Sequence, residues 1–264
     1  MKISLVQFAP KLGDTEKNIS QISDLIKPLE SELFVLPELA NSGYNFKDKI
    51  SALEASETVD RSVFLDELTQ LAKSKGTHIV TGFCEQKNNQ LYNSSVLLGP
   101  EGIIGLYRKL HLFLNEKDIF SPGNLGLPVF ETELGKIGML VCFDWMFPEA
   151  WRKLCLEGAQ IVAHPSNLVL PYCQSVIPSY SLINRCFIAT ANRIGTEGEL
   201  TFTGQSVLTN PLGETILSGE TDKSQVLNAE IDLSLADNKF ITEKNDAFAD
   251  RRIDVYGNLN PQDD

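Results

Sequence analysis

The chain has 264 residues, of which 42% are hydrophobic and 22% are charged, a composition that is ordinary for a globular domain. Acidic side chains outnumber basic ones by 35 to 23, which gives a formal net charge of −12. Such a surface repels phosphate backbones and anionic lipids, and no basic cluster in the sequence offsets it. We therefore expect no nucleic-acid partner and no membrane-surface role.

The amino terminus, MKISLVQFAP, carries one basic residue and no long apolar run with a small-residue cleavage site. We interpret this segment as a first strand and not as a signal peptide. No window approaches the roughly 18 uninterrupted apolar residues of a membrane span. These features predict a cytoplasmic protein.

Cysteines and histidines are the residues that a metal or redox site would need. The cysteine count is odd, no C-x-x-C is present, and the histidines lie far apart. These spacings argue against a disulfide framework, a thioredoxin-like redox site and a metal site. The residues concerned are Cys84, Cys142, Cys155, Cys173, Cys186, His78, His111 and His164.

Hydrophobic periodicity in the first third of the chain predicts a strand, a helix, a strand and a second helix, in that order. Asp14 or Thr15 can cap the first helix, and Gly76 is a stop signal for the second. The expected elements cover residues 2–8, 14–30, 33–38 and 61–76.

From residue 77 onward strands predominate, and KNNQ, GPEG and NPLGE are typical of the turns between them. Two helices interrupt the strands, one over 147–158 with Pro148 in its first turn and one over about 174–186. The expected strands cover 77–86, 90–102, 103–113, 136–143, 159–167, 187–194, 201–210, 213–218 and 225–232.

Two segments resemble each other and indicate two similar α/β halves. SELFVLPELAN (31–41) and AQIVAHPSNL (159–168) both follow a helix and contain a strand, a proline and polar residues. No linker or break in composition divides the chain, so we predict one domain over residues 1–264, with helices covering sheets. The charged tail, about 238–264, is expected to pack on this domain or on a partner subunit.

Cys142, in MLVCFDWMFPE, ends an apolar strand and lies just before an expected helix. A free cysteine is usually a small core residue, and the other four cysteines fit that description. Near a helix amino terminus, however, the peptide N–H groups favour an anion, so a thiolate nucleophile would be stabilised here.

A thiolate needs a base and a group that stabilises charge on the substrate. His111 and His164 are candidates for a Cys-His site, although single histidines in such contexts are more often hydrogen-bonded core residues. His111 has strand spacing from Lys109, which would place both side chains on one face. Glu38 follows a buried strand and a proline, where ligand sites of α/β sheets occur. Taken singly, Glu38, Lys109 and Glu116 could each be an ordinary surface residue.

In combination, PELANSGYNF, YRKLHLFLNEKDIFSPG and MLVCFDWMFPE resemble the nitrilase superfamily of carbon–nitrogen hydrolases in order and separation. The resemblance extends over nearly the whole chain and includes NRCFIATANRIG and DRRIDVY. It matches the family's Glu-Lys-Cys triad with Glu38, Lys109 and Cys142, and a second family glutamate with Glu116. It implies an α/β fold, a four-layer α-β-β-α sandwich of the carbon–nitrogen hydrolase type, and a homodimer or higher homo-oligomer.

The resemblance also implies a mechanism without a metal or an organic cofactor. Lys109 would lower the pKa of Cys142 below its reference of about 8.5 and, with the Phe143 N–H, form the oxyanion hole. Glu38 would transfer the proton and then activate water for hydrolysis of a thioester. Glu116 would position Lys109 or the substrate, and the titrations of these groups should be coupled.

The expected reaction is hydrolysis of a small aliphatic amide to carboxylate and ammonia. Phe143-Asp144 stands where many nitrilases carry Trp-Glu, so a nitrile is the second choice and an N-carbamoyl amine the third. Asp144 is expected to flank the nucleophile and to help select the substrate. Residues expected to frame the substrate pocket are Tyr44, Phe113, Trp145, Phe147 and Asn167, together with Pro171 and Tyr172.

Three other functions remain open at this point. A papain-like hydrolase would require His111 or His164 beside Cys142. A non-catalytic subunit that binds small carboxylates would usually lack a triad residue, whereas all three are present here. A redox-sensing thiol protein would leave Glu38 and Lys109 without a role.

Overall fold

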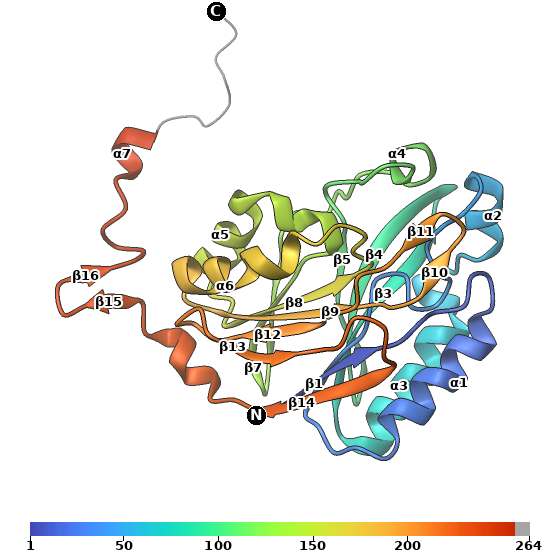
Figure 1. The fold of residues 1–264 in the computed structure, drawn as a ribbon, viewed down its shortest axis with the longest axis horizontal. Helices are drawn as coiled ribbons and strands as arrows, with labels where there is room; N and C mark the ends of the chain where they lie inside the picture. The colour runs from blue at the N-terminus through green and yellow to red at the C-terminus, as the bar shows by residue number, and fades with distance from the viewer. Residues whose placement is uncertain (257–264) are drawn as a thin grey trace, which may run out of the picture.

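Two six-stranded β-sheets pack face to face, and helices cover the outer face of each (Figure 1). In the computed structural model, which describes residues 1–256, strands β1 and β3 of the first sheet contact β9 and β8 of the second. Helices α1 and α3 pack on the first sheet, and α5 and α6 cover the second. This architecture is the expected four-layer α-β-β-α sandwich.

The first sheet has the strand order β14-β1-β2-β3-β4-β5. Its strands are β14 (Gln225–Glu230), β1 (Lys2–Gln7), β2 (Leu33–Val35), β3 (His78–Lys87), β4 (Gln90–Gly99) and β5 (Gly102–Arg108). The second sheet has the order β13-β12-β9-β8-β7-β6. Its strands are β13 (Thr215–Ser218), β12 (Val207–Thr209), β9 (Phe187–Asn192), β8 (Ile161–Ser166), β7 (Gly135–Met139) and β6 (Val129–Thr132).

The helices that cover the sheets are α1 (Thr15–Ile26), α3 (Val63–Lys75), α5 (Pro148–Leu156) and α6 (Cys173–Asn184). The shorter elements are α2 (Lys49–Glu54), α4 (Glu116–Ile119), α7 (Ile253–Tyr256), the 3-10 helices η1 (Val59–Arg61), η2 (Cys142–Met146) and η3 (Leu233–Asp237), and two hairpins. The hairpins pair β10 (Thr196–Glu197) with β11 (Leu200–Thr201), and β15 (Phe240–Thr242) with β16 (Asn245–Asp246).

The residues expected to start and stop the first two long helices do so in the structure. The Asp14 side chain accepts a hydrogen bond from the Lys17 N–H and caps α1. Gly76 adopts a left-handed conformation, with φ +62°, where α3 ends. Both helices bury their apolar stripe against the first sheet through Ile22, Ile26, Phe64, Leu65, Leu68, Leu71 and Ala72.

The two halves of the chain repeat one topology, as the similar segments at 31–41 and 159–168 indicated. Strands β1, β2 and β3 are parallel to one another, and so are β7, β8 and β9. Each set has one further strand on its first side and two on the other, and each of these strands is antiparallel to its neighbour. Strand β2 in the first sheet therefore corresponds to β8 in the second.

Two local expectations were wrong near Cys142. Strand β5 ends at Arg108 and not at residue 113, so His111 does not share a strand face with Lys109. Cys142 does not lie directly before α5, because the 3-10 helix η2 occupies Cys142–Met146 and α5 begins at Pro148. The amino terminus nearest the thiol therefore belongs to η2.

The tail leaves the sheets after η3 and extends away from them (Figure 1). It contacts the domain at Phe248, whose ring lies 5.0 Å from the Arg152 guanidinium of α5 and 4.9 Å from the Lys239 ammonium. Residues 257–264 lie outside the described part of the chain. Packing of the rest of the tail on the domain or on a partner stays a prediction.

Strand β3 holds the loop after β2 at Gly82. The Gly82 N–H donates to the Pro37 carbonyl at 3.0 Å, and the Gly82 carbonyl accepts from the Ala40 N–H at 3.2 Å. A Cβ at position 82 would lie 2.3 Å from both the Glu38 Cα and the Leu39 nitrogen. Only glycine permits this approach of two backbones, so Gly82 fixes where Glu38 stands.

We predict that Gly82→Ala lowers the free energy of unfolding by about 3 kcal/mol or more, because neither backbone can move away from the added methyl group. Gly76→Ala is the matched control, since its Cβ meets nothing within 4 Å and only its positive φ opposes the change. We expect Gly76→Ala to cost about 1 kcal/mol. Urea denaturation of both variants measures the difference, and equal losses would contradict the close approach.

Candidate active site

Three charged side chains meet in the interior between the sheets and the loop that follows β5. The Lys109 Nζ lies 2.7 Å from Glu38 Oε1 and 2.8 Å from Glu116 Oε1. All three are buried, with 0% of Glu38, 1% of Lys109 and 4% of Glu116 exposed. Glu38 follows β2, Lys109 follows β5 and Glu116 begins α4, so three separate segments supply the cluster. Glu38, Lys109 and Glu116 were all expected to lie together.

One carboxylate oxygen of Glu38 accepts two hydrogen bonds and the other accepts none from the described residues. Oε1 accepts a hydrogen bond from Asn93 Nδ2 at 2.6 Å in addition to the one from Lys109. Oε2 is buried and has no hydrogen-bond partner among residues 1–256. The Glu38 backbone carbonyl accepts from Asn167 Nδ2 at 3.0 Å, which fixes the residue further. The arrangement leaves a positioned carboxylate oxygen with capacity to accept a proton.

Cys142 stands at the start of η2 in a conformation that is uncommon for a residue with a side chain. Its φ is +43°, in the left-handed region. The residue is 4% exposed and lines a cavity of about 120 Å³. Strained backbone of this kind often occurs at functional sites, where the surrounding structure holds it in place. Cys142 therefore lines a small, partly open cavity at a sharp turn.

The balance of burial and charge around Cys142 corrects the expectation that Lys109 brings the pKa of this thiol below its reference value. Burial raises the pKa of the Cys142 thiol well above its usual value, and the Glu38 carboxylate raises it further. Lys109 and a hydrogen bond with the Asn167 backbone act in the opposite direction, but they do not outweigh burial and the two carboxylates. The resting residue is a neutral thiol, so attack on a substrate requires a base.

The remaining groups of the cluster influence one another. Burial alone would lower the pKa of Lys109, but the charges of Glu116 and Glu38 outweigh it and raise this pKa, so Lys109 is an ammonium. Burial raises the pKa of Glu116, Lys109 lowers it and Glu38 raises it. Burial also raises the pKa of Tyr44, with Glu116 as the next cause, so Tyr44 remains a neutral donor. Its hydroxyl donates to Glu116 Oε1 at 2.7 Å.

The cavity that contains Cys142 is lined mainly by apolar side chains. Of the residues expected to frame a substrate, Phe113, Trp145, Asn167 and Tyr172 line it, as does Phe143. The other lining residues are Met146, Leu168, Val169 and Leu170. Its volume is small beside the 300–1,000 Å³ of typical ligand pockets. The space is therefore small and offers mainly apolar contacts.

Three expected pocket residues do not line this cavity. The Phe147 ring stacks on the His111 ring, with centroids 3.5 Å apart, and meets Phe143 edge to face. Pro171 is likewise not one of the lining residues. Tyr44 lies on the far side of Glu116, in the wall of a different cavity. Phe147 and Tyr44 therefore support neighbours of the thiol in this structure.

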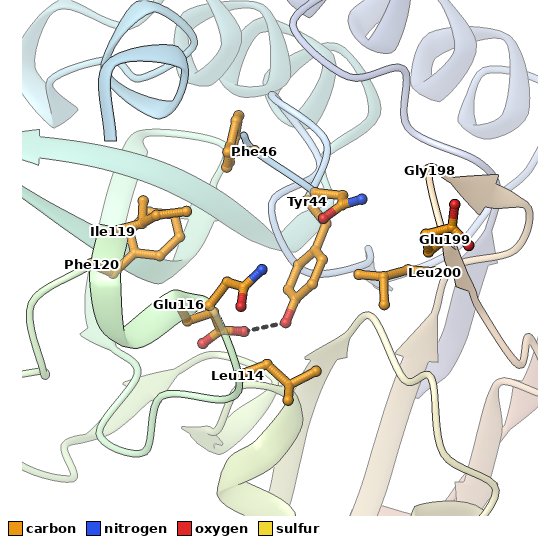
Figure 2. A pocket seen from close by; sticks show the side chains of 11 residues that line it. Tyr44, Phe46, Leu114, Glu116, Ile119, Phe120, Gly198, Glu199 and Leu200 are labelled. Carbon is orange, nitrogen blue, oxygen red and sulfur yellow. Dashed lines mark hydrogen bonds between the residues drawn. The ribbon is translucent and has the colours of Figure 1, made fainter. Parts of the chain in front are cut away.

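Figure 2 shows that second cavity, with the dashed Tyr44–Glu116 hydrogen bond at its wall. Its volume is about 330 Å³, and its other lining residues come from the loop before α2, from α4 and the residues that flank it, and from the tip of the β10–β11 hairpin. They are Asn45, Phe46, Leu114, Asn115, Ile119, Phe120, Gly198, Glu199 and Leu200. Neither Cys142 nor Lys109 lines it, so the smaller cavity is the candidate site for reaction.

Phe143, the expected oxyanion-hole residue, directly follows Cys142 in the chain. It is the second residue of η2, and N–H groups in the first turn of a helix have no acceptor within that helix. Such a donor, one residue after the thiol, can stabilise negative charge on an atom that the sulfur attacks. The Lys109 ammonium supplies the second positive group near the thiol.

Neither histidine is placed as a base for the thiol. His164 Nε2 lies 2.9 Å from the backbone carbonyl oxygen of Cys142, and its Nδ1 lies 3.0 Å from the Thr190 hydroxyl. His111 Nδ1 lies 2.8 Å from Asp144 Oδ1. Burial lowers the pKa of His164 to about 4, so this ring is neutral near pH 7. The Cys-His alternative is wrong, and His164 supports the backbone of the nucleophile.

Asp144 has a structural role, and it does not line the cavity of Cys142, so the expectation that it helps select the substrate stays a prediction. The residue is fully buried. Oδ2 accepts from the Tyr107 hydroxyl at 2.7 Å and from the Val141 N–H at 3.0 Å. Oδ1 accepts from the His111 N–H at 3.1 Å. Asp144 thus ties the turn that carries Cys142 to the segment that carries Lys109.

Asn93 is the site residue that sequence reasoning missed. It lies on β4, 55 residues from the Glu38 carboxylate that it contacts, and its backbone carbonyl accepts from the Lys109 N–H at 2.8 Å. The available signal was the polar run Asn93-Ser94-Ser95, which interrupts an otherwise apolar strand and is fully buried. Buried polar side chains of this kind require partners.

Within residues 1–256, no group of three His, Cys, Asp or Glu side chains could hold a metal ion. The cluster of Glu38, Glu116 and Lys109 instead carries its own cation. In the same part of the chain, no helix is both long and apolar enough to cross a membrane.

Comparison with known proteins places the chain among related sequences and structures. The sequence model described as Carbon-nitrogen hydrolase matches residues 2–238. A nitrilase of Pyrococcus abyssi (strain GE5 / Orsay) is 41% identical over 97% of this chain and 99% of its own. An (R)-stereoselective amidase of a Pseudomonas species is 31% identical over 97% of this chain and 93% of its own.

A solved structure shares the architecture. A Glu-to-Gln mutant of the amidase from Nesterenkonia sp. AN1, 25% identical, superposes with a TM-score of 0.83 over 97% of this chain and 95% of its own. That structure shows covalent addition of the acetamide moiety of fluoroacetamide at the active site cysteine. Nitrilases and amidases thus both occur among the proteins that this chain resembles.

We predict that His164 makes stability depend on pH. Because its folded pKa is about 4 and the unfolded value is about 6.5, the unfolded chain binds the proton more tightly. This contribution is present above pH 6.5 and is lost as the pH falls toward 4, by about 3 kcal/mol. The difference in unfolding free energy between wild type and His164→Gln should narrow by that amount between pH 7 and pH 4 in urea denaturation. A constant difference would contradict a neutral buried ring.

Proposed function

The chain belongs to the carbon-nitrogen hydrolase family, and from that premise we propose that it hydrolyses a small aliphatic amide to a carboxylate and ammonia. One observation carries the proposal. A neutral thiol at the floor of an apolar cavity of about 120 Å³ lies beside a buried Glu-Lys-Glu cluster. Glu38 in that cluster has one oxygen free to accept a proton. The cluster thus places a base, Glu38, and a cation, Lys109, beside the Cys142 sulfur.

Acylation begins with transfer of the Cys142 proton to Glu38 Oε2 as the sulfur attacks the amide carbon. The negative charge that develops on the amide oxygen is stabilised by the Lys109 ammonium and the Phe143 N–H. Glu38 then delivers the proton to the departing nitrogen, the C–N bond breaks, and ammonia leaves. The acyl group remains on Cys142 as a thioester.

Deacylation uses the same groups with water as nucleophile. Glu38 takes a proton from a water molecule while the water oxygen attacks the thioester carbon. The C–S bond then breaks in the second half of the step. The carboxylic acid is released and the proton returns to the thiol. Glu116, hydrogen-bonded to Lys109 and to Tyr44, keeps the ammonium in place in both halves of the reaction.

A nitrile is the second candidate substrate, and two observations favour keeping it. The relative that is 41% identical is described as a nitrilase, and the cavity around Cys142 offers mainly apolar contacts to a linear carbon chain. A nitrile would pass through a thioimidate and require two waters. An N-carbamoyl amine fits less well, because its second nitrogen would meet few polar lining groups beyond Asn167.

A binding subunit without catalysis is disfavoured by the cluster itself. Binding a carboxylate needs positive groups, whereas Glu38 and Glu116 put two carboxylates beside one ammonium. We further propose that the protein forms a homodimer or higher homo-oligomer in the cytoplasm. The exposed apolar side chains of the tail and of α6 support association, among them Ile253, Val255, Leu182 and Ile183.

We predict that Cys142→Ala and Glu38→Gln each lower ammonia release from small amides by at least about a thousandfold, since each removes a group that takes part in bond making. A panel of acetamide, propionamide and butyramide, with the matching nitriles and carbamoyl amines, identifies the substrate class. Cys84→Ala is the matched control, because Cys84 is also a fully buried thiol but lies on β3 outside the site.

Ammonia release by Cys142→Ala at the wild-type rate would contradict the mechanism. Turnover of nitriles with no turnover of amides would replace the amide by the nitrile as the substrate. A third outcome, tight binding of carboxylates with no turnover at all, would favour the binding subunit.

We also predict that Leu170→Ala shifts the preference toward longer acyl chains. Leu170 lines the cavity and is 44% exposed, so its truncation enlarges the space without opening the core. We expect the ratio of kcat/KM for butyramide to that for acetamide to rise about fourfold, the effect of burying one more methylene group at about 0.8 kcal/mol. Leu125→Ala, also 44% exposed but outside the cavity, should leave the ratio unchanged. An unchanged ratio in Leu170→Ala would place the acyl group elsewhere.

A further inference from the structure

Arg193, immediately after β9, is a buried cation that the proposed reaction does not use. It is 1% exposed, and its Nη1 lies 2.7 Å from Glu197 Oε1. Its other nitrogens donate to the carbonyls of Pro10 and Ile194 at 3.2 and 3.3 Å. A guanidinium with this many fixed contacts is held in one position.

Glu197, the partner of Arg193, reaches the loop that carries Tyr44. Its Oε2 accepts hydrogen bonds from the Tyr44 N–H at 3.0 Å and from the Asn45 N–H at 2.8 Å. Asn45 Nδ2 donates in return to the Glu197 backbone carbonyl at 2.8 Å. The β10–β11 hairpin and the loop at Tyr44 are therefore joined through one carboxylate, 152 residues along the chain from Asn45.

The same arginine also supports the Tyr44 ring. The Arg193 guanidinium lies 4.0 Å from the centre of the Phe202 ring. Phe202 in turn meets the Tyr44 ring edge to face, with centroids 5.8 Å apart. Arg193 thus fixes the Tyr44 backbone through Glu197 and the Tyr44 ring through Phe202.

Tyr44 transmits this position to the catalytic cluster. Figure 2 shows its hydroxyl pointing to Glu116, with the hairpin tip at Gly198–Leu200 on its other side. Glu116 Oε1 accepts from both Tyr44 and Lys109, at 2.7 and 2.8 Å. A shift of the tyrosine would release one of the two carboxylates that hold the Lys109 ammonium.

We propose that the buried Arg193–Glu197 pair is a positioning device that holds Tyr44 against Glu116 and so keeps Lys109 beside Cys142. This inference rests on the proposed function of the cluster. Buried ion pairs contribute little net stability relative to apolar residues, because both charges lose their hydration. This pair instead fixes positions, because the Glu197 carboxylate binds the arginine and accepts hydrogen bonds from two backbone N–H groups at the same time.

The test is a double-mutant cycle on the rate at which iodoacetamide alkylates Cys142 at pH 7, with the adduct mapped by peptide mass. Displacement of Lys109 removes the charge that partly offsets burial of the thiol. We expect Tyr44→Phe to slow alkylation about tenfold, the change in thiolate fraction produced by one pKa unit. Glu197→Gln should slow alkylation at least threefold. The double variant, Glu197→Gln with Tyr44→Phe, should be no slower than Tyr44→Phe alone.

Arg185→Gln is the control for loss of a buried charged side chain outside the site. Arg185 is 5% exposed and donates to the carbonyls of Asn238 and Pro211, away from the site. We expect this variant to lower Tm but to alkylate at the wild-type rate. If Glu197→Gln fails to fold, Asn45→Ala removes only the tether to the Glu197 carbonyl and should slow alkylation in the same direction. Additive effects in the cycle, or equal rates in Glu197→Gln and wild type, would overturn the proposal.

A second readout separates this inference from the proposed function. On any substrate that turns over, Glu197→Gln should lower kcat about as much as it lowers the alkylation rate and leave KM within twofold, because Tyr44 does not line the cavity of Cys142. A rise in KM as large as the expected fall in kcat, with kcat itself unchanged, would contradict the positioning role. Alkylation requires no turnover, so the cycle still decides the inference if the panel identifies no substrate.

Discussion

The Lys109 ammonium, shared between Glu38 and Glu116 in the interior, is the interaction on which the rest of the site depends. Two glutamates stand beside one cation. Burial and these two side chains raise the pKa of the nearby Cys142 thiol, while Lys109 lowers it. Because desolvating three charges gives little net stability, the cluster is best understood as part of the chemistry and not as a support for the fold.

The repeated topology explains how distant segments meet. Glu38 follows β2, and Asn167 follows β8, the strand that corresponds to β2 in the other sheet. The two residues are joined by the hydrogen bond from Asn167 Nδ2 to the Glu38 carbonyl. Packing two similar sheets face to face thus brings equivalent strand ends together, with Cys142 contributed by η2, which follows the neighbouring strand β7. Small shifts are prevented by close contacts such as Gly82 against the Glu38 backbone.

Much of the fold could be predicted because its signals are local. Alternating and helical periodicities, caps and prolines marked β1, α1, α3 and α5, and the resemblance of 31–41 to 159–168 indicated the two halves. The sign of the Cys142 pKa shift was missed for a different reason. It is the balance of burial against three charges, and burial is a property of the whole fold.

Partners across long sequence separations were missed for a related reason. Asn93 and Arg193 act through hydrogen bonds to residues that no local pattern connects to them, and Asp144 looked like a pocket residue because aromatic neighbours surround it. Its four acceptor contacts become visible only when β5 and η2 are placed side by side.

A neutral resting thiol changes how the proposed mechanism must be understood. If Lys109 had made a permanent thiolate, Glu38 would be needed only to protonate the leaving nitrogen and to activate water. With the proton still on sulfur, Glu38 must accept it during attack, so the free Oε2 becomes the starting point of the reaction. The same protonation limits reaction with oxidants, since the thiolate is the reactive form. Because the two carboxylates help to keep the sulfur protonated, the sulfur becomes reactive when a substrate is present that can take up the negative charge of the attack.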